Sequence, residues 1–391
     1  MKKIFSITLA LMMALSSLSA GLTAFAREIH ATDEDGYETV FEINDSNITS
    51  VYTEKVTATK ATITWNFQTW ADDYGFEILL DEGSKGDFST VIDCRVTSSF
   101  DYYEYTLRNL KAATYYSFKI RYYQIEYGVK YYGNTSGVYA FATAPEATAL
   151  LSAKYVKKGK IKVKWRKAVG ATGYLVQYST SKKFKSGYTD TVDLKSNKST
   201  YTVGGLAKAK YYFRILPYKT AGKNEPSIAS ASNVKTAKVK KGCTLKQTIN
   251  YTKTGLSGRK RIKRLTKNGV DIKKYKSTYS RIKAIYNWHA KHYKDFSNCL
   301  ECNSHFNDCI YALYDGVKYQ DGYVTIAAGR FKNLSGSTPI HKWSVLFFAG
   351  KPYIFDPRMQ GYTGNFKGNT YFGIPFGSKA AKKRYIFEGW F

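Results

Sequence analysis

The chain has 391 residues, of which 43% are hydrophobic and 16% aromatic, and it contains only seven prolines. This composition is sufficient for a sizeable core, so it excludes a largely disordered protein and predicts two or three domains. Sixty Lys and Arg residues against 30 Asp and Glu give a formal charge of +30. A surface of this charge attracts anionic polymers over long distances.

The first 26 residues have the organisation of a secretory signal peptide. A positive start at Lys2 and Lys3 precedes an apolar run from Ile4 to Leu18, and Ala24-Phe25-Ala26 is a small-residue cleavage site. A membrane anchor is the alternative, but the run is short for one. We therefore predict a bacterial protein that is secreted or cell-wall associated, with no transmembrane segment. Its basic surface is then expected to meet anionic cell-wall polymers rather than nucleic acid, or simply to be solvated.

Two all-β regions follow an acidic leader segment, residues 27–48. Residues 49–145 and 146–238 both contain short runs of alternating apolar residues separated by turn residues, which is the pattern of a β-sandwich. The sequence Ile161–Trp165 parallels Ala61–Trp65. The two regions therefore indicate an internal duplication of about a hundred residues.

Both repeats resemble fibronectin type III domains. The resemblance implies that Trp65 and Trp165 are buried, and that Tyr116 or Tyr212 forms the tyrosine corner of the sandwich. These residues are therefore expected to be structural, and no ligand is assigned to them. Modules of this kind are usually spacers or adhesion units, which is an analogy between folds and not a statement about this chain.

A basic connector is predicted for residues 239–259, and a third domain for residues 260–391. Within this domain, apolar residues recur on one side of Tyr279–Tyr293 at helical spacing. We expect a helix there, in which His289 and His292 are packing or surface residues rather than ligands.

The stretch from Asn298 to Pro357 contains the residue types of a nucleophile, a base and an orienting group. Cys302 begins a run with helical spacing of the apolar residues Phe306, Cys309, Ile310 and Leu313. The candidate caps for this helix are Asn298, Asn303 and Ser304. At the start of a helix the dipole favours the reactive thiolate, so Cys302 is the predicted nucleophile.

A β-hairpin is predicted after this helix, with its turn at Ala349-Gly350. With that turn, Phe348 faces Lys351, and His341 becomes the diagonal neighbour of Asp356 on the same face of the hairpin. Diagonal neighbours lie about 7–8 Å apart at the backbone, which is within reach of side chains. A loop of odd length would break this parity.

The order and spacing of these segments resemble the transglutaminase-like superfamily. The resemblance rests on Arg281–Trp288, the cysteine-containing helix followed by Gly316, His341-Lys342-Trp343 and Asp356-Pro357. It implies an α+β papain-like domain, with the Cys on a helix and the His and Asp on adjacent strands.

Within the resemblance, Cys302 is the nucleophile, His341 the base and Asp356 the orienting group. Many members of the family have Gly before the residue that precedes the Cys, whereas this chain has Leu300 there, with Cys299 just upstream. This departure leaves the neighbouring cysteines open as alternatives.

The cysteines allow two further interpretations. The chain has five, Cys94, Cys243, Cys299, Cys302 and Cys309, so at least one is unpaired within the chain. Cys299, Cys302, His305 and Cys309 have the residue types of a zinc site. However, they are crowded into one short segment, and we predict no bound metal and no cofactor. A disulfide between Cys299 and Cys309 is also open.

The sequence thus predicts two fibronectin type III-like sandwiches ahead of a transglutaminase-like domain. The expected function is that of an exported cysteine enzyme that transfers acyl groups from amides of proteins or peptidoglycan peptides. Transfer to water would make it a protease or deamidase, and transfer to an amine a crosslinking transglutaminase. The alternative is a catalytically inactive adhesion or binding protein of the cell surface.

Overall fold

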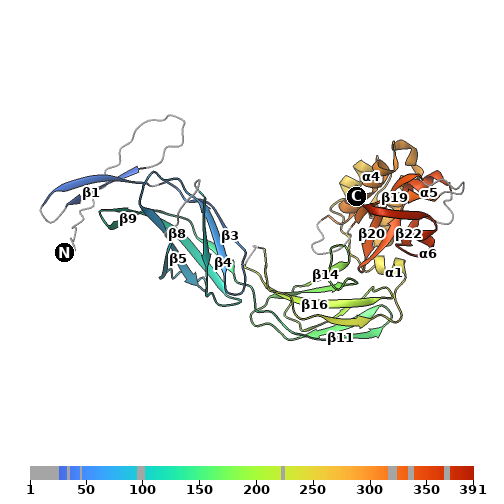
Figure 1. Cartoon of the computed structure of the whole chain (residues 1–391), viewed down its shortest axis with the longest axis horizontal. Helices are drawn as coiled ribbons and strands as arrows, with labels where there is room; N and C mark the ends of the chain where they lie inside the picture. Colours follow the sequence, from blue (N-terminus) through green and yellow to red (C-terminus); the bar gives the residue numbers. More distant parts are fainter. Residues whose placement is uncertain are drawn as a thin grey trace. The chain divides into compact units, whose positions relative to one another are not determined.

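The computed structural model of the chain describes residues 26–32, 36–44, 46–94, 102–221, 225–315, 324–332, 339–364 and 370–391 (Figure 1). The predicted signal peptide lies outside the described residues except for Ala26, and Gly316 lies outside them as well. The chain divides into two compact units, one of residues 1–146 with the short segments 168–172 and 217–230, the other of the remaining residues from 147 to 391. Within the described part, no helix combines the length and apolar character needed to cross a bilayer.

The segment expected to be a leader contains regular structure. Strands β1 (Ala26–Thr32) and β2 (Glu38–Asn44) form an antiparallel ribbon in which Ile29 pairs with Phe41. Ile29 and Ile43 are buried and belong to the core of the first sandwich. The sequence interpretation missed the ribbon because this acidic segment shows no clear periodicity of apolar residues.

The first sandwich consists of a three-stranded sheet, β3-β4-β7, and a five-stranded sheet, β10-β8-β5-β6 with β9 beside β8. Trp65 is fully buried between them and packs edge-on against Phe76 at 5.1 Å. The strands are β3 (Thr49–Glu54), β4 (Ala61–Asn66), β5 (Tyr74–Glu82), β6 (Thr90–Cys94), β7 (Tyr102–Leu107), β8 (Tyr115–Glu126), β9 (Val129–Thr135) and β10 (Tyr139–Ala142).

The second sandwich repeats this plan with sheets β11-β12-β15 and β14-β13-β16-β17, and β18 also pairs with β16. Two facing antiparallel sheets of this kind are the architecture shared by fibronectin type III modules. Trp165 is buried against Tyr174 at 5.4 Å, as expected. The strands are β11 (Leu150–Lys157), β12 (Lys160–Trp165), β13 (Gly173–Ser179), β14 (Thr189–Leu194), β15 (Thr200–Val203), β16 (Lys210–Lys219), β17 (Ser227–Ile228) and β18 (Lys235–Lys238).

At the start of β16 in the second sandwich, the buried tyrosine is Tyr211, and not Tyr212, which the sequence analysis named for the tyrosine corner. Tyr211 is fully buried, whereas Tyr212 is only partly buried, because alternate residues of β16 point to opposite faces. The Tyr211 hydroxyl accepts a hydrogen bond from the backbone of Ala207 and donates one to the Ala349 carbonyl at 3.1 Å. In the first sandwich the Tyr116 hydroxyl accepts from the Lys111 N–H at 2.9 Å.

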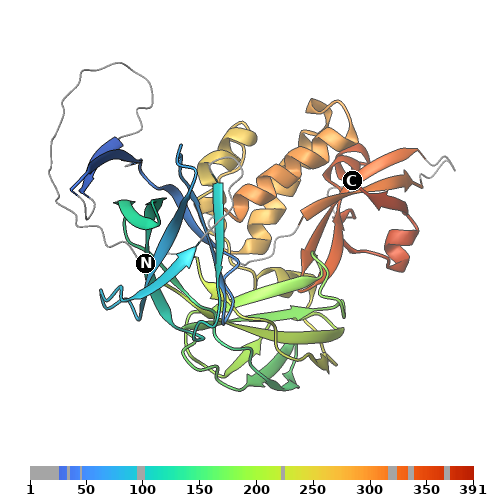
Figure 2. The same ribbon diagram turned by 60° about the vertical axis from the view of Figure 1, so that its left-hand side comes forward.

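The C-terminal region is an α+β arrangement around a five-stranded antiparallel sheet of order β22-β21-β20-β19-β23. Figure 2 shows its yellow and orange helices on one side of the orange-red and red sheet. The strands are β19 (Val324–Phe331), β20 (Ile340–Phe348), β21 (Lys351–Phe355), β22 (Phe372–Pro375) and β23 (Tyr385–Trp390). The helices are α1 (Leu245–Ile249), α2 (Arg259–Leu265), α3 (Thr278–Lys291), α4 (Cys299–Leu313), α5 (Pro357–Tyr362) and α6 (Lys379–Lys382), with 3-10 turns at Ile272–Lys274 and Tyr293–Asp295.

Alternate residues of β20 build two separate cores. Leu346 and Phe348 pack with the apolar faces of α3 and α4, which include Ile285 and Phe306. Trp343 and its alternating neighbours pack on the opposite face of the sheet. Each large side chain buried in this way contributes about 1.5–3 kcal/mol. Strand β20 is thereby fixed from both sides, and with it the position of His341 at its start.

The predicted connector is part of the C-terminal core. Residues 239–259 contain α1, and a reciprocal capping box between Thr244 and Gln247 stabilises the start of this helix. Ile249 of α1 is fully buried among residues of α3 and α4. The sequence analysis predicted only a connector here because the stretch is rich in Lys, and it did not detect the short buried helix.

Candidate active site

Helix α4 begins at Cys299 and not at Cys302. Asn298 is its N-cap, with an extended backbone and a side-chain oxygen that accepts a hydrogen bond from the Glu301 N–H at 2.9 Å. The Glu301 carboxylate in turn accepts bonds from the backbone and hydroxyl of Ser297 at 2.7 and 2.6 Å. The first N–H groups of a helix have no acceptor within it and carry the positive end of its dipole. Cys299 occupies this first position.

The predicted hairpin is confirmed in its turn, register and parity. Phe348 pairs with Lys351, and Ala349 and Gly350 both have positive φ, of 49° and 65°, as a two-residue turn matched to the strand twist requires. His341 and Asp356 consequently meet on one face. The His341 Nε2 lies 2.7 Å from the Asp356 Oδ2.

Asp356 is fully buried and held by three donors. Its Oδ2 accepts hydrogen bonds from His341 and from the Tyr385 hydroxyl, the latter at 3.0 Å. Its Oδ1 accepts from the Met359 N–H at 3.1 Å, because Asp356 is also the N-cap of α5. The carboxylate therefore cannot rotate without breaking several bonds, and it fixes the plane of the imidazole. A carboxylate only accepts when ionised, so Nε2 carries the proton and Nδ1 is left for the thiol.

The thiol beside His341 belongs to Cys299. His341 and the Cys299 side chain share a hydrogen bond, and the backbone N–H of Lys342 donates to the same sulfur. Cys302 lies one turn further along α4, is fully buried, and belongs to the core formed with α3 and β20. The structure thus brings His341 and Asp356 together as predicted but places Cys302, the predicted nucleophile, in the core. The physical reason is that the helix starts three residues earlier, which turns Cys302 inward.

The charges of the cluster favour an ion pair between the cysteine and the histidine. Burial by itself raises the pKa of Cys299, but the hydrogen bond and charge of His341 lower it overall. Burial likewise lowers the pKa of His341, but the charge and hydrogen bond of Asp356, together with Cys299, raise it to about 10. By contrast, burial raises the pKa of Cys302 far above its usual value and that of Cys309 to about 12. Among these three thiols, only that of Cys299 has its pKa lowered, which favours the reactive thiolate.

Asn303 ties the helix start to the strand that carries His341. Its side-chain amide donates to the Cys299 carbonyl at 2.8 Å and to the Lys342 carbonyl at 3.0 Å. Its amide oxygen accepts from the backbone N–H and hydroxyl of Ser344 at 3.2 and 3.0 Å. Asn303 is fully buried and every polar atom of its side chain is used, so it acts as a positioning residue. The sequence interpretation considered Asn303 only as a helix cap.

Native-state labelling with iodoacetamide should modify Cys299 at a lower pH than an ordinary thiol. A lowered pKa keeps the thiolate present as the pH falls, so the midpoint of its alkylation rate should lie below the value of about 8.5 for free cysteine. Cys302 and Cys309 should stay unmodified until the protein is denatured. Peptide mapping by mass spectrometry across the pH range gives the answer. A Cys299 midpoint at or above that of free cysteine would contradict the ion pair.

All five cysteines are free thiols, so the alternative pairing of Cys299 with Cys309 is not formed. The four residues weighed as zinc ligands do not lie together in one cluster. Cys299 lies against His341, whereas His305 and Cys309 lie with His289 of α3.

Comparison with solved structures finds likeness to fibronectin type III domains. No family model matches the sequence, and no curated protein matches it. Among solved structures, a segment of two fibronectin type III domains from chicken tenascin has 15% identity and a TM-score of 0.28, covering 49% of this chain and 99% of the other. The FN1–FN3 domains of chicken CNTN1 have 14% identity and a TM-score of 0.31, covering 55% of this chain and 77% of the other.

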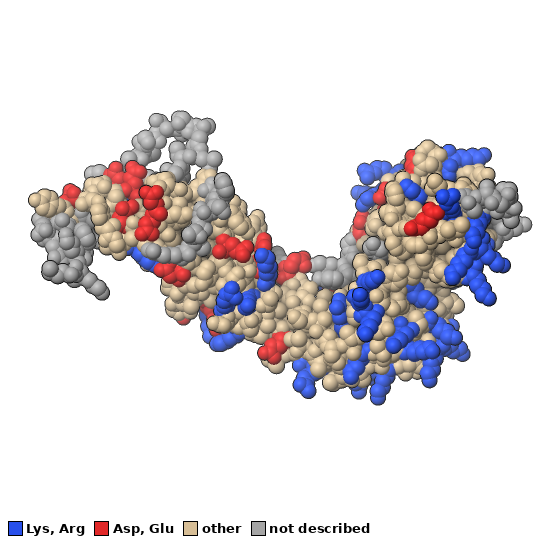
Figure 3. All heavy atoms as spheres, viewed as in Figure 1, with Lys and Arg blue, Asp and Glu red and all other residues tan. Residues whose placement is uncertain are grey.

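The positive charge is unevenly distributed along the chain. On the face shown in Figure 3, Lys and Arg gather over the second sandwich and the C-terminal region, and Asp and Glu over the first sandwich. Most Lys and Arg residues follow residue 146, in agreement with this view. The basic surface therefore belongs to the same part of the protein as the cysteine–histidine cluster.

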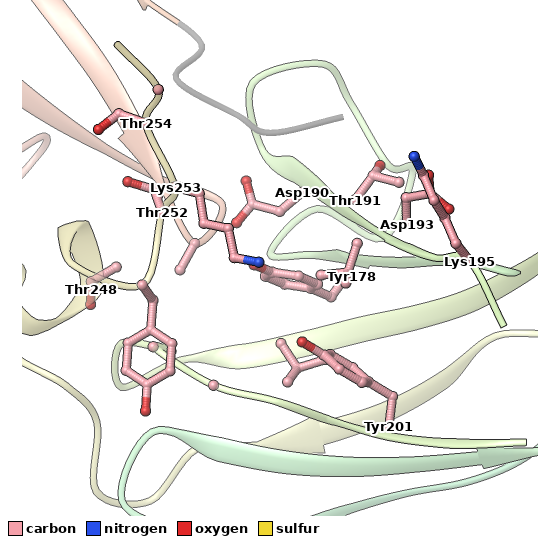
Figure 4. Close-up of a pocket in the computed structure, with 17 residues that line it drawn as sticks. Tyr178, Asp190, Thr191, Asp193, Lys195, Tyr201, Thr248, Thr252, Lys253 and Thr254 are labelled. Atoms are coloured by element: carbon pink, nitrogen blue, oxygen red, sulfur yellow. The ribbon is translucent and has the colours of Figure 1, made fainter. Parts of the chain in front are cut away.

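A hollow of about 750 Å³ lies near the turn of the hairpin, at Ala349, and is lined by residues of the second sandwich and the segment after α1. Figure 4 shows Tyr178, Asp190 and Lys253 pointing toward one another within it. His341 lies at the opposite end of β20 from this turn. The hollow is therefore separate from the cysteine–histidine cluster.

Proposed function

We propose that the protein is an exported, cysteine-dependent acyl-transfer enzyme with a papain-like, transglutaminase-like C-terminal domain, in which Cys299 is the nucleophile. The observation that carries the proposal is the contact between Cys299 and a His341 that is itself hydrogen-bonded to Asp356. The order of nucleophile, base and orienting group along the chain, and their placement on a helix start and a hairpin, are the features that resemble the superfamily.

The cluster supports a two-step reaction. The Cys299 thiolate attacks the carbonyl carbon of an amide, and the negative charge that develops on the oxygen is stabilised by N–H groups at the start of α4. The His341 imidazolium then donates its Nδ1 proton to the leaving nitrogen, the C–N bond breaks, and ammonia or an amine departs. A thioester remains on Cys299.

In the second step His341 is neutral and accepts a proton from an incoming nucleophile. Attack by water releases a carboxylic acid, whereas attack by a primary amine forms a new amide, and either one restores the thiolate. His341 is only 6% exposed and is flanked by Trp343, Phe331 and Tyr385. These rings exclude water, which costs each charge part of its hydration but strengthens the attraction between the two charges.

The substrates proposed are side-chain or peptide amides of proteins and of peptidoglycan peptides, at a secreted or cell-wall location. The location rests on the first 26 residues of the sequence. The basic surface is proposed to hold the protein on anionic wall polymers, which would raise the local concentration of substrate.

Activity should be detectable when the full chain from Arg27 is incubated with a glutamine-containing protein and with peptidoglycan fragments. Ammonia release reports hydrolysis, incorporation of a fluorescent primary amine reports transamidation, and mass spectrometry detects cleavage. We expect a substrate-derived acyl adduct on Cys299 in trapped reactions. If no reaction occurs and Cys299 forms no adduct with any of these substrates, the protein is an inactive binding protein that has kept the fold.

A further inference from the structure

A second cluster of nitrogen and sulfur ligands lies on the other side of helix α4 from the β20 contacts of Asn303. His305 and Cys309 are one turn apart on α4, so they share a face of this helix, and His289 faces them from α3. The ligand atoms of all three residues lie within 4.8 Å of one another. His289 and Cys309 are fully buried, while His305 is partly exposed.

The hydrogen bonds of His289 show which of its nitrogens faces the cluster with a lone pair. Its Nδ1 lies 2.8 Å from the Ile285 carbonyl oxygen, which can only accept, so Nδ1 carries the proton. Its Nε2 is then an acceptor, and it lies 2.9 Å from the Nδ1 of His305. A histidine that donates one ring N–H to a carbonyl and offers its other nitrogen is oriented as metal-binding histidines usually are.

We propose that His289, His305 and Cys309 form a zinc site. Two imidazole nitrogens and a thiolate are the donor types that zinc prefers, at about 2.0–2.1 Å for nitrogen and about 2.3 Å for sulfur. The ion would take the place of the proton that His305 now shares with His289, and the Cys309 thiol would lose its proton on binding. Three protein ligands leave a fourth position for water, beside the partly exposed His305.

The proposal departs from our prediction of no bound metal, and its ligands differ from the four residues that the sequence analysis weighed as a zinc site. Cys299 is excluded because it lies at His341, and Cys302 because it is not among the three residues whose ligand atoms lie within 4.8 Å of one another. His289 enters because the packing of α3 on α4 brings it within reach, so the ligands come from two segments and not one. Bound zinc would link these two helices and is independent of the proposed acyl transfer.

Cobalt titration of the metal-free full chain tests the site without any enzymatic assay. We expect one Co²⁺ per chain with a sulfur-to-cobalt absorption band in the near ultraviolet, displaced by an equivalent of Zn²⁺, and a rise in melting temperature with Zn²⁺. His305→Asn should bind Co²⁺ at least tenfold more weakly, so that the band appears only at a higher cobalt concentration, whereas His305→Cys should keep binding. Matched controls are His292→Ala, at the C-cap of α3, and Cys302→Ala, the neighbouring thiol of α4. Both variants should bind the metal as the unmodified protein does.

Two results would overturn the proposal. One is the absence of a sulfur-to-cobalt band together with no effect of Zn²⁺ on the melting temperature, which would leave His289 and His305 as a hydrogen-bonded pair of the core. The other is binding that survives in folded His305→Asn but is lost in Cys302→Ala, which would move the site toward the set suggested by the sequence. Circular dichroism of each variant establishes that it is folded.

Discussion

Replacing Cys299 by serine is expected to abolish acyl transfer and to remove the alkylation that occurs below the pKa of an ordinary thiol. A serine hydroxyl is a far weaker nucleophile at this pH, and residues of a catalytic group act as a unit, so the loss should be roughly a thousandfold or more. The side chain is only half-buried at the start of α4, so the fold should tolerate the change. Ammonia release, amine incorporation and the melting temperature are the measurements.

The matched control is Cys302→Ala on the same helix. Cys302 is fully buried, so its truncation should lower the free energy of unfolding by about 1 kcal/mol while leaving most of the activity. The opposite outcome, in which Cys302→Ala is inactive and Cys299→Ser remains active, would restore the assignment made from the sequence.

Asp356→Asn should lower the rate of acyl transfer by roughly 10⁴-fold, the scale seen when the orienting carboxylate of a catalytic group becomes an amide. The amide oxygen can still accept from the Met359 N–H and cap α5. Its NH₂ group, however, would face the His341 Nε2 and force the ring proton onto Nδ1. With the imidazolium less favoured, the pKa of His341 should fall and that of Cys299 should rise.

Two measurements separate this effect from simple unfolding. The pH profile of Cys299 alkylation should move upward toward that of free cysteine, and circular dichroism should stay unchanged. Tyr385→Phe is the matched control, because it removes one donor to the same carboxylate and keeps the His341 bond. It should cost far less activity. An alkylation profile that Asp356→Asn leaves unmoved would show that this carboxylate does not support the ion pair.

The hairpin was predictable because a two-residue turn fixes the parity of every pair that follows it. The turn at Ala349 and Gly350 set the face on which His341 and Asp356 meet, and no tertiary information was needed. The burial of the sandwich tryptophans could be predicted for a similar reason, because side chains along a strand alternate between its two faces with a period of two.

The choice of cysteine was not predictable in the same way. Cys299 and Cys302 are three residues apart, so both fit near the start of a helix whose first residue depends on which polar side chain caps it. The hydrogen bond that the Asn298 side chain accepts from the Glu301 N–H decides this, and two other residues were equally plausible caps. The roles of Tyr385 and Asn303 could not be predicted, because their hydrogen-bond partners are distant in sequence. These partners are Asp356 and Ser344, respectively.

The ligands of the proposed zinc site show the same limit. Helical spacing correctly placed His289 on the buried side of α3, and a buried histidine is most often a packing residue. The residues that His289 contacts depend on how α3 crosses α4, and the spacing of residues within one helix does not predict that crossing.

The turn between β20 and β21 is also held by the second sandwich. The Tyr211 and Thr180 hydroxyls donate to the carbonyls of Ala349 and Gly350, and Tyr188 packs edge-on against Phe347 at 5.2 Å. Two modules that look separable in sequence are therefore joined by these contacts. A recombination event that exchanged this sandwich for another of its kind would have to supply the same hydroxyls and ring, so the pair should be transmitted through evolution together.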